Sequence, residues 1–243
     1  MIRFENVSYT YPGADEVLHD ISFSIERGEK VGLIGANGAG KTTILKASLG
    51  LIQTTGTITV GGLPMSRENL SAIRKKLGYV LQNSDNQMFM PTVIEDMIFG
   101  PVNYGMSRDD AEKKADEVLK ELNIEYLKTR QNHRMSGGEK RLAAIATVLT
   151  MEPEALLMDE PSSALDPKNR RNLINLLKRL WDKSRITYVI TTHDLDLVLD
   201  TCERVIILNN GRIAADGPAE VILRDQALLE ANDLELPFCF AGR

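Results

Sequence analysis

The sequence has few of the residues and runs that mark several large protein classes. Its 243 residues include two cysteines and three histidines without CxxC or zinc-type spacing, which predicts reduced thiols and no transition-metal site. No uncharged apolar run reaches the roughly 18 residues of a membrane helix, and no export signal is visible at the N-terminus. We therefore expect a cytosolic protein that does not span a bilayer.

Positive charge is not in excess either. With 29 Lys and Arg against 34 Asp and Glu, the net charge is −5, which argues against nucleic acid as a partner. Hydrophobic residues at 43% and charged residues at 26% are typical of a globular chain, and there are no repeats or low-complexity tracts. At this length we expect one large domain or two closely joined ones.

Hydrophobic periodicity predicts an α/β fold. Residues 21–25 and 57–60 alternate apolar and polar positions, as antiparallel strands with one exposed face do. The period becomes helical between residues 92 and 151, and short apolar strands then alternate with a helical stretch, which predicts a parallel sheet. Asn210-Gly211 predicts a hairpin turn, and Pro218 is expected to open a last helix.

The segment GANGAGKT at residues 35–42 matches the phosphate-loop pattern GxxxxGK[ST], between a predicted strand and a predicted helix. Its glycines let backbone amides wrap phosphate oxygens, and the helix N-terminus adds its positive end. Lys41 is expected to reach the β- and γ-phosphates, and Thr42 to offer its hydroxyl to Mg²⁺. The residues expected to bind the nucleotide here are Gly35, Asn37, Gly38, Gly40, Lys41, Thr42 and Thr43.

An apolar strand at residues 155–158 ends in two acids, Asp159 and Glu160. A carboxylate in this place binds Mg²⁺ directly or through water, and its neighbour is placed to polarise the attacking water. We therefore expect Asp159 to serve the metal and Glu160 to act as the catalytic base. No NKxD-type guanine-reading motif is present, so ATP with Mg²⁺ is the expected ligand.

The segment MSGGEKR at residues 135–141 resembles the LSGGQ signature of ATP-binding cassette (ABC) proteins, and it lies about 20 residues before the acidic strand end, as in that family. Ser136 and Glu139 also have the spacing of an ordinary capping box, which is the structural alternative. Met135 and Glu139 replace the usual leucine and glutamine of the signature, so a side-chain role for Glu139 does not carry over.

Further family marks follow in the expected order. Tyr11 resembles the aromatic that stacks on adenine, Gln82 the glutamine of the Q-loop, and His193 the switch histidine, while residues 163–166 resemble the D-loop that ends in Asp166. Each has a structural alternative as well: Tyr11 as hairpin core, Gln82 as surface, Asp166 as a helix N-cap and His193 as a strand-end residue. The resemblance covers nearly the whole chain.

The family resemblance implies that two chains form a head-to-tail dimer around two ATP molecules. Ser136 and Gly138 of one chain would contact the γ-phosphate bound by the other, and Asp166 would couple the two sites. His193 would hold the γ-phosphate and orient water with Glu160, and Gln82 would contact Mg²⁺ and water. The partner is expected to be a second copy, with pairing to a paralogue left open.

The resemblance also implies a single nucleotide-binding domain with a P-loop NTPase (RecA-like) core, an antiparallel β subdomain and an inserted α-helical subdomain. The expected boundaries are about 1–30 and 56–62 for the β part, 31–90 and 152–216 for the core, 91–151 for the helical part and 217–243 for a helical tail. The tail is expected to pack or dimerise through Leu228, Leu229 and Leu234.

Residues 78–89 and 92–101 resemble a segment of the ATPases of energy-coupling factor (ECF) importers. In that family a short helix after the Q-loop glutamine receives coupling helices of a transmembrane component. The residues expected in or beside this helix are Asp85, Asn86, Gln87, Met88 and Phe89. The alternative is a polar loop with a core phenylalanine.

Within the ECF group the chain is similar above all to ATPases of cobalt and nickel importers. The implied function is ATP hydrolysis that energises cobalt or nickel uptake, by a peripheral subunit at the cytoplasmic face of the cell membrane. Its partners would be a transmembrane component and, through it, a substrate-binding membrane component. The alternatives are the ATPase of a vitamin ECF importer or of another ABC importer, a soluble ABC protein, and a nucleotide-dependent module without turnover.

Overall fold

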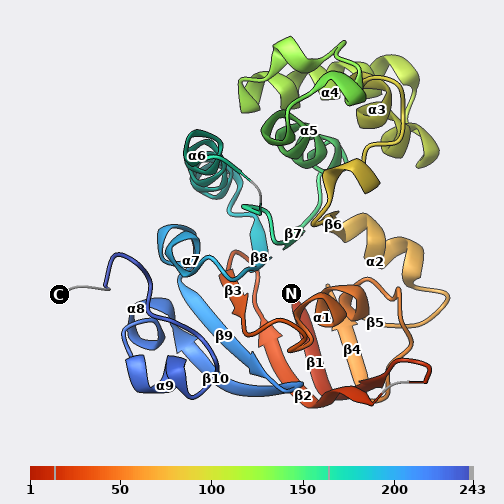
Figure 1. Ribbon diagram of the computed structural model, residues 1–243. Coiled ribbons are helices and arrows are strands. Elements are labelled where there is room, and N and C mark those ends of the chain that lie inside the picture. The colour runs from red at the N-terminus through yellow and green to blue at the C-terminus, as the bar shows by residue number, and fades with distance from the viewer. Residues whose placement is uncertain (14, 164, 241–243) are drawn as a thin grey trace.

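The computed structural model describes residues 1–13, 15–163 and 165–240 (Figure 1). Two of the segments considered above extend beyond these residues. Ala164 of the 163–166 segment and residues 241–243 of the tail lie outside the described part of the chain.

A parallel sheet forms the centre of the molecule. In the described residues its strand order is β10-β9-β3-β8-β7-β6. The parallel strands are β3 (Lys30–Ile34), β6 (Leu77–Val80), β7 (Ala155–Asp159), β8 (Thr187–Thr191) and β9 (Arg204–Asn209). The edge strand β10 (Arg212–Pro218) pairs with β9 in antiparallel orientation across the predicted Asn210-Gly211 turn.

Apolar cores lie on both faces of this sheet. Leu156 and Met158 of β7 belong to one core, and Ala155 and Leu157 of the same strand belong to the other. Side chains of a strand point alternately to opposite faces, so a strand covered on both faces is apolar throughout. This explains why β7 reads as a continuous apolar run that ends at the polar Asp159.

A second, antiparallel sheet has the order β2-β1-β4-β5. Its strands are β1 (Ile2–Thr10), β2 (Glu16–Ile25), β4 (Thr57–Val60) and β5 (Leu63–Pro64). Phe4 of β1 pairs with Phe23 of β2 and with Ile58 of β4, and it is buried in the same core as helix α1 (Lys41–Ser48). The antiparallel part therefore packs against the helix that follows the phosphate loop.

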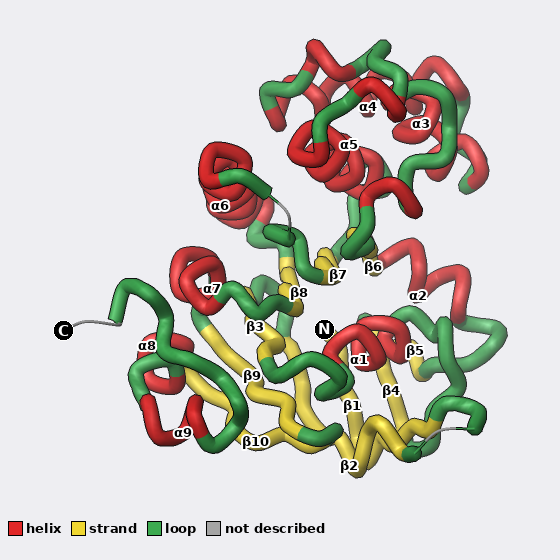
Figure 2. The backbone as a smooth tube through the Cα atoms, viewed as in Figure 1, coloured by secondary structure: helices red, strands yellow, loops and turns green. Residues whose placement is uncertain are grey.

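The helices between β6 and β7 form a separate arm, which we call the helical arm (residues 93–149). Its helices are α3 (Val93–Asn103), α4 (Arg108–Leu122) and α5 (Gly137–Leu149), with 3-10 turns η1 (Ser84–Asn86) before them and η2 (Glu125–Leu127) and η3 (Asn132–Arg134) within. Helix α2 (Leu70–Lys76) leads into β6. Because β6 pairs with β7, the chain leaves the sheet and returns to it at adjacent strands. Figure 2 shows α3 and α4 farthest from the sheets, whereas α5 shares an apolar core with β6 and β7.

The remaining helices follow β7 in the sequence and pack on the parallel sheet. They are α6 (Pro167–Ser184), α7 (Leu195–Thr201), α8 (Ala219–Ile222) and α9 (Gln226–Glu230). The prediction that Pro218 opens a helix is confirmed, because Pro218 is the N-cap of α8 as well as the last residue of β10. That helix is not the last one, because α9 follows it. Leu229 and Leu234 are buried in the core and Leu228 packs against it, so the described part of the tail packs on its own chain.

The architecture confirms the predicted α/β class, with a P-loop core, an antiparallel β part and an inserted helical part. Among the described residues, no helix is both long and apolar enough to cross a membrane.

Candidate active site

The phosphate loop connects β3 to α1 through glycines in conformations that other residues rarely adopt. Gly35 has a φ of 152°, and a Cβ there would lie 2.1 Å from the carbonyl oxygen of Leu208. Gly40 precedes α1 with a φ of 106° and no side-chain cap, so the first amides of the helix stay available to a ligand. Asn37 and Gly38 are exposed in the loop between these glycines.

Lys41 folds back onto the loop that it terminates. Its ammonium donates to the carbonyl oxygens of Gly35 at 2.7 Å and Ala36 at 3.1 Å, and the residue is 8% exposed. Burial lowers the pKa of Lys41, while the carboxylates of Glu160 and Asp159 oppose this shift by favouring the charged form. The loop thus holds a cation, with little solvent around it, where a phosphate chain would lie.

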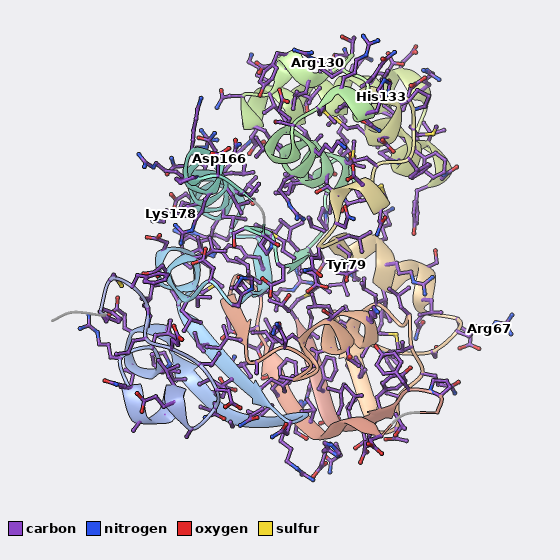
Figure 3. The ribbon with its side chains drawn as sticks, viewed as in Figure 1. Arg67, Tyr79, Arg130, His133, Asp166 and Lys178 are labelled. Atoms are coloured by element: carbon purple, nitrogen blue, oxygen red, sulfur yellow. The ribbon has the colours of Figure 1, made fainter. Side chains whose placement is uncertain are left out.

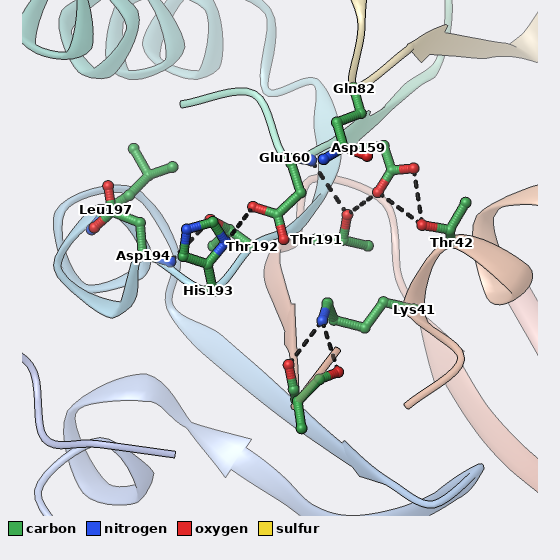
Figure 4. Close-up of polar contacts among 12 residues, drawn as sticks. Lys41, Thr42, Gln82, Asp159, Glu160, Thr191, Thr192, His193, Asp194 and Leu197 are labelled. Carbon is green, nitrogen blue, oxygen red and sulfur yellow. Dashed lines mark hydrogen bonds and ion pairs between the residues drawn. The ribbon is translucent and has the colours of Figure 1, made fainter. Parts of the chain in front are cut away.

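Asp159 ends β7 beside Thr42, the second residue of α1 (Figure 4). The Thr42 hydroxyl donates to both carboxylate oxygens, at 2.9 and 3.2 Å, and the Thr191 hydroxyl donates to Asp159 Oδ1 at 2.5 Å. The Tyr79 hydroxyl lies 3.4 Å from Oδ2. Burial and the nearby Asp159 charge raise the pKa of Tyr79, so its hydroxyl stays protonated and can donate.

Glu160 adopts a left-handed backbone with a φ of 46°, which is uncommon for a residue other than glycine. Its amide donates to the carbonyl oxygen of Thr191 at 2.9 Å, and this bond holds the turn after β7 against β8. The buried Oε2 makes no hydrogen bond within the described residues, although His193 Nδ1 lies 2.9 Å away. The carboxylate is thus paired with a histidine whose side chain is itself largely exposed (Figure 4).

These residues fit a magnesium nucleotide. Hard oxygen donors from Thr42 and Asp159 face each other at the end of the phosphate loop, and Mg²⁺ is commonly bound by one or two such groups together with substrate phosphates. No group of three or more His, Cys, Asp or Glu that could hold a metal by itself occurs in the described residues. The donor set is thus suited to a cation that arrives with ATP.

Tyr11 and Gln82 lie beside this cluster. The Tyr11 hydroxyl is 3.3 Å from the Thr43 hydroxyl, and its ring meets the edge of Tyr9 at 4.7 Å, so it follows β1 beside α1. Gln82 is exposed just after β6, and Figure 4 shows its side chain near Asp159. Its backbone carbonyl accepts a hydrogen bond from Arg141 of α5.

Ser136 caps α5 on the helical arm. Its hydroxyl accepts from the amide of Glu139 at 3.3 Å, and Glu139 Oε2 accepts from the Ser136 amide at 2.8 Å, which completes a capping box. The bond from that amide lowers the pKa of Glu139. The carboxylate that replaces the usual glutamine is thereby engaged in capping, as the structural alternative for this segment predicts.

Gly138 packs against the start of α6. A Cβ on Gly138 would meet the Asn169 side-chain nitrogen at 2.3 Å, and that amide donates to Asp166 at 2.6 Å. Asp166 also caps α6, and the backbone bond from Asn169 lowers its pKa. Among the described residues, no hydrogen bond or ion pair joins Ser136, Gly138 or Asp166 to the cluster around Lys41, so one chain gathers its candidate residues into two separate groups.

The cluster includes residues that sequence reasoning missed. Thr191 and Tyr79 hold Asp159, and Arg170 of α6 donates to both oxygens of Asp194, at 2.7 and 3.0 Å, directly after His193. Asp194 also caps α7. These partners are 24 or more residues apart in the chain, so no local sequence pattern predicts the contacts between them.

The sequence matches the ABC transporter family over residues 18–163. A putative ABC transporter ATP-binding protein of Streptomyces coelicolor is 44% identical over 98% of this chain and 90% of its own length. The energy-coupling factor transporter ATP-binding protein EcfA of Methanothermobacter thermautotrophicus is 39% identical over 98% of this chain and 77% of its own length.

Solved structures of ABC transporter ATP-binding proteins have the same fold as this chain. CbiO1 from Clostridium perfringens, described as part of the ABC transporter complex cbiONQ, superposes with a TM-score of 0.85 at 33% identity, over 95% of this chain and 93% of its own. The ATP-binding cassette MJ0796, a dimer in a post-hydrolysis state with ADP and phosphate, superposes with a TM-score of 0.81 at 28% identity, over 90% and 99%.

Proposed function

The chain belongs to the ABC transporter family of ATPases, and we propose that it energises an ECF-type importer whose transported substrate is cobalt or nickel ions. As a member of that family it is the ATP-hydrolysing subunit of a transporter and uses ATP with Mg²⁺. The structural observation that supports docking to an importer is a groove, lined by both polar and apolar residues, beside the segment that follows Gln82.

For hydrolysis we assign complementary roles to the two acids. Asp159, held by three hydroxyls, serves with Thr42 and Gln82 as a ligand of Mg²⁺, which offsets the charge that develops on the phosphates. Glu160 accepts the proton of the attacking water, and His193, whose Nδ1 lies 2.9 Å from Glu160 Oε2, is placed beside it to hold the γ-phosphate. The residues assigned to bind ATP are Tyr11, Gly35, Asn37, Gly38, Gly40, Lys41, Thr42 and Thr43.

A second ATPase subunit completes each site in this proposal. A Cβ on Gly137 would meet nothing within 4 Å, so the backbone at the start of α5 is open to a phosphate bound elsewhere. Because Ser136 and Gly138 make no hydrogen bond or ion pair with their own phosphate loop in the described part of the chain, a head-to-tail pair of identical chains uses both groups of residues. Asp166, which fixes the Asn169 side chain under Gly138, then links one site to the other.

The groove lies where η1 and η3 approach each other, with a volume of about 370 Å³. Its lining residues are Asp85, Met88, Phe89, Met90, Pro91, Asn132, His133 and Lys140. Phe89 is 64% exposed at its rim and meets the ring of Phe99, itself 42% exposed, edge to face at 4.9 Å. Figure 3 shows His133 on the helical arm, well away from Asp166.

The exposed rings of Phe89 and Phe99, beside the half-buried Met90, suit an apolar partner segment, and a coupling helix of a transmembrane component has that chemistry. The chain would then be a peripheral subunit at the cytoplasmic face of the cell membrane. Through the transmembrane component it would act on a substrate-binding membrane component. EcfA and the cbiONQ subunit support this assignment by similarity alone.

The test is uptake of labelled Co²⁺ and Ni²⁺ by source cells that carry the wild-type protein, Glu160→Gln or Phe89→Ala. We expect Glu160→Gln to abolish uptake of one metal because hydrolysis stops. Phe89→Ala should reduce uptake of that metal several-fold while ATP hydrolysis by the purified chain persists, because only docking is weakened. Tyr126→Ala, an exposed aromatic of η2 outside the groove, is the matched control.

Unchanged uptake of both metals in Glu160→Gln cells, at equal protein levels and equal ATP binding, would refute the metal assignment. Vitamin uptake would be measured next in the same cells. Equal losses in Phe89→Ala and Tyr126→Ala would refute the groove as the docking site.

A further inference from the structure

One buried cation has no part in the chemistry assigned above. Arg141, in the second turn of α5, is 4% exposed. Its Nη1 donates to the carbonyl oxygen of Leu81 and its Nη2 to that of Gln82, while Nε makes no hydrogen bond within the described residues. Burial lowers the pKa of Arg141, and the charge of Asp159 opposes that shift. A buried cation held by neutral carbonyls costs folding free energy, so a functional reason for its presence is to be sought.

The two carbonyls belong to the segment that carries Gln82 to the active site. Gln87 fastens the same segment, because its Oε1 accepts from the Leu81 amide and its Nε2 donates to the carbonyl of Ala144 in α5, both at 2.9 Å. Lys140 of α5 pairs with Asp85 of η1. Three side chains therefore tie residues 81–87 to the helix that Ser136 begins.

This attachment has a mechanical consequence. Thr42 and Asp159 belong to the sheet and its phosphate loop, whereas Gln82 is bonded to the helical arm. Any movement of the arm relative to the sheet therefore carries Gln82 and Ser136 together. The groove at Phe89 lies on the same unit, so a partner docked there acts on both residues at once.

We propose that Arg141 is a positioning residue that holds Gln82 against α5, the helix that follows Ser136. One movement of the helical arm then brings Gln82 to the Mg²⁺ of its own chain and Ser136 to the nucleotide of a second copy. This inference rests on the role proposed for Gln82. Arginine is required because its planar fork reaches two carbonyl oxygens simultaneously, which the single ammonium of lysine does not.

The test compares kcat and KM for ATP in the full-length wild type, Arg141→Lys, Gln82→Ala and the double variant. We expect Arg141→Lys to lower kcat roughly tenfold and to change KM less than about twofold, because the phosphate loop that binds ATP is untouched. The double variant should be no slower than Gln82→Ala alone, because the two residues act as one unit. The matched control, Arg108→Lys on the exposed surface of α4, should retain wild-type values.

A merely structural role would lower kcat through loss of folded protein, and the two losses would then multiply in the double variant. Multiplied losses, or wild-type kcat in Arg141→Lys, would overturn the inference. A wild-type kcat in Gln82→Ala would overturn the role of Gln82 itself, and this outcome is distinct from the loss of coupling alone.

Hydrogen exchange supplies a readout that does not depend on activity. In Arg141→Lys we expect faster exchange of the amides of residues 81–87 and unchanged exchange in α3, because only the fastening to α5 is loosened. Unchanged exchange in residues 81–87 would overturn the inference even if kcat fell.

Discussion

At the scale of single residues, two adjacent acids have different surroundings and therefore different chemistry. Asp159 accepts hydrogen bonds from Thr42, Thr191 and Tyr79, which hold it in one orientation. Glu160 turns away through a left-handed backbone and places its Oε2 2.9 Å from His193 Nδ1. A carboxylate fixed by hydroxyls is suited to a metal, and one paired with a histidine is suited to proton transfer.

We predict that Glu160→Gln lowers kcat for ATP by about 100-fold or more, because the amide cannot accept the proton of the attacking water. ATP affinity should change less than about twofold, and an ATP-bound dimer should accumulate with Mg²⁺-ATP. Turnover assays, equilibrium ATP binding and measurement of mass in solution check these points. Glu117→Gln, at an exposed position of α4, is the control, and near-normal turnover in Glu160→Gln would discard Glu160 as the base.

The phosphate loop could be predicted because its chemistry is local. Glycines, Lys41 and Thr42 act within one strand-loop-helix unit, so their spacing alone specifies the geometry. The contacts that hold Asp159 could not be predicted in the same way. Thr191 and Tyr79 contact it from the two neighbouring parallel strands, and a short sequence segment does not predict the order of strands in a sheet.

At the scale of elements, an ion pair joins the start of α6 to the start of α7. Arg170 binds both oxygens of Asp194, and Asp194 caps the helix that follows His193. Burial favours the neutral acid, but the bonds from Arg170 and from the Leu197 amide outweigh it, and the pKa of Asp194 is lowered. The pair thus sets where α7, and with it His193, lies relative to α6.

We predict that Arg170→Met lowers the free energy of unfolding by about 2 kcal/mol at neutral pH, because a bidentate charged contact is lost. A lowered folded-state pKa contributes stability that is fully present above the ordinary value of 3.8 and lost as pH falls through the lowered value. The difference from the wild type should therefore be constant between about pH 8 and 5 and shrink below it. Urea unfolding across this range, with Arg179→Met as control, measures it, and a difference that grows on acidification would contradict it.

Element boundaries could be predicted where a cap or turn has a local signature. The Asn210-Gly211 hairpin and the Ser136 and Asp166 caps occur at the predicted positions. A helix starts after Pro218 as predicted, but the sequence did not indicate that α9 follows it or that Pro218 also pairs with Arg204 at the sheet edge. Pairing between strands is tertiary information that proline alone does not carry.

At the scale of the whole molecule, the candidate site residues divide between the sheet and the helical arm. The arm is inserted between adjacent strands and carries Ser136 and, through Arg141, Gln82, whereas Lys41 and Glu160 stay with the sheet. Sequence motifs indicated both groups of residues, and the resemblance alone implied that two chains combine them. The described chain makes no bond between Ser136 and its own phosphate loop, which agrees with that arrangement.

The most direct measurement is ATP turnover in a mixture of Lys41→Ala and Ser136→Arg chains. Each variant alone should be inactive, because every site in its dimer lacks either the phosphate-loop lysine or the signature serine. A mixed dimer contains one intact site, built from the phosphate loop of one chain and the signature of the other. We therefore expect an equal mixture to regain about a quarter of wild-type turnover. No recovery in the mixture, or activity in either variant alone, would contradict the shared site.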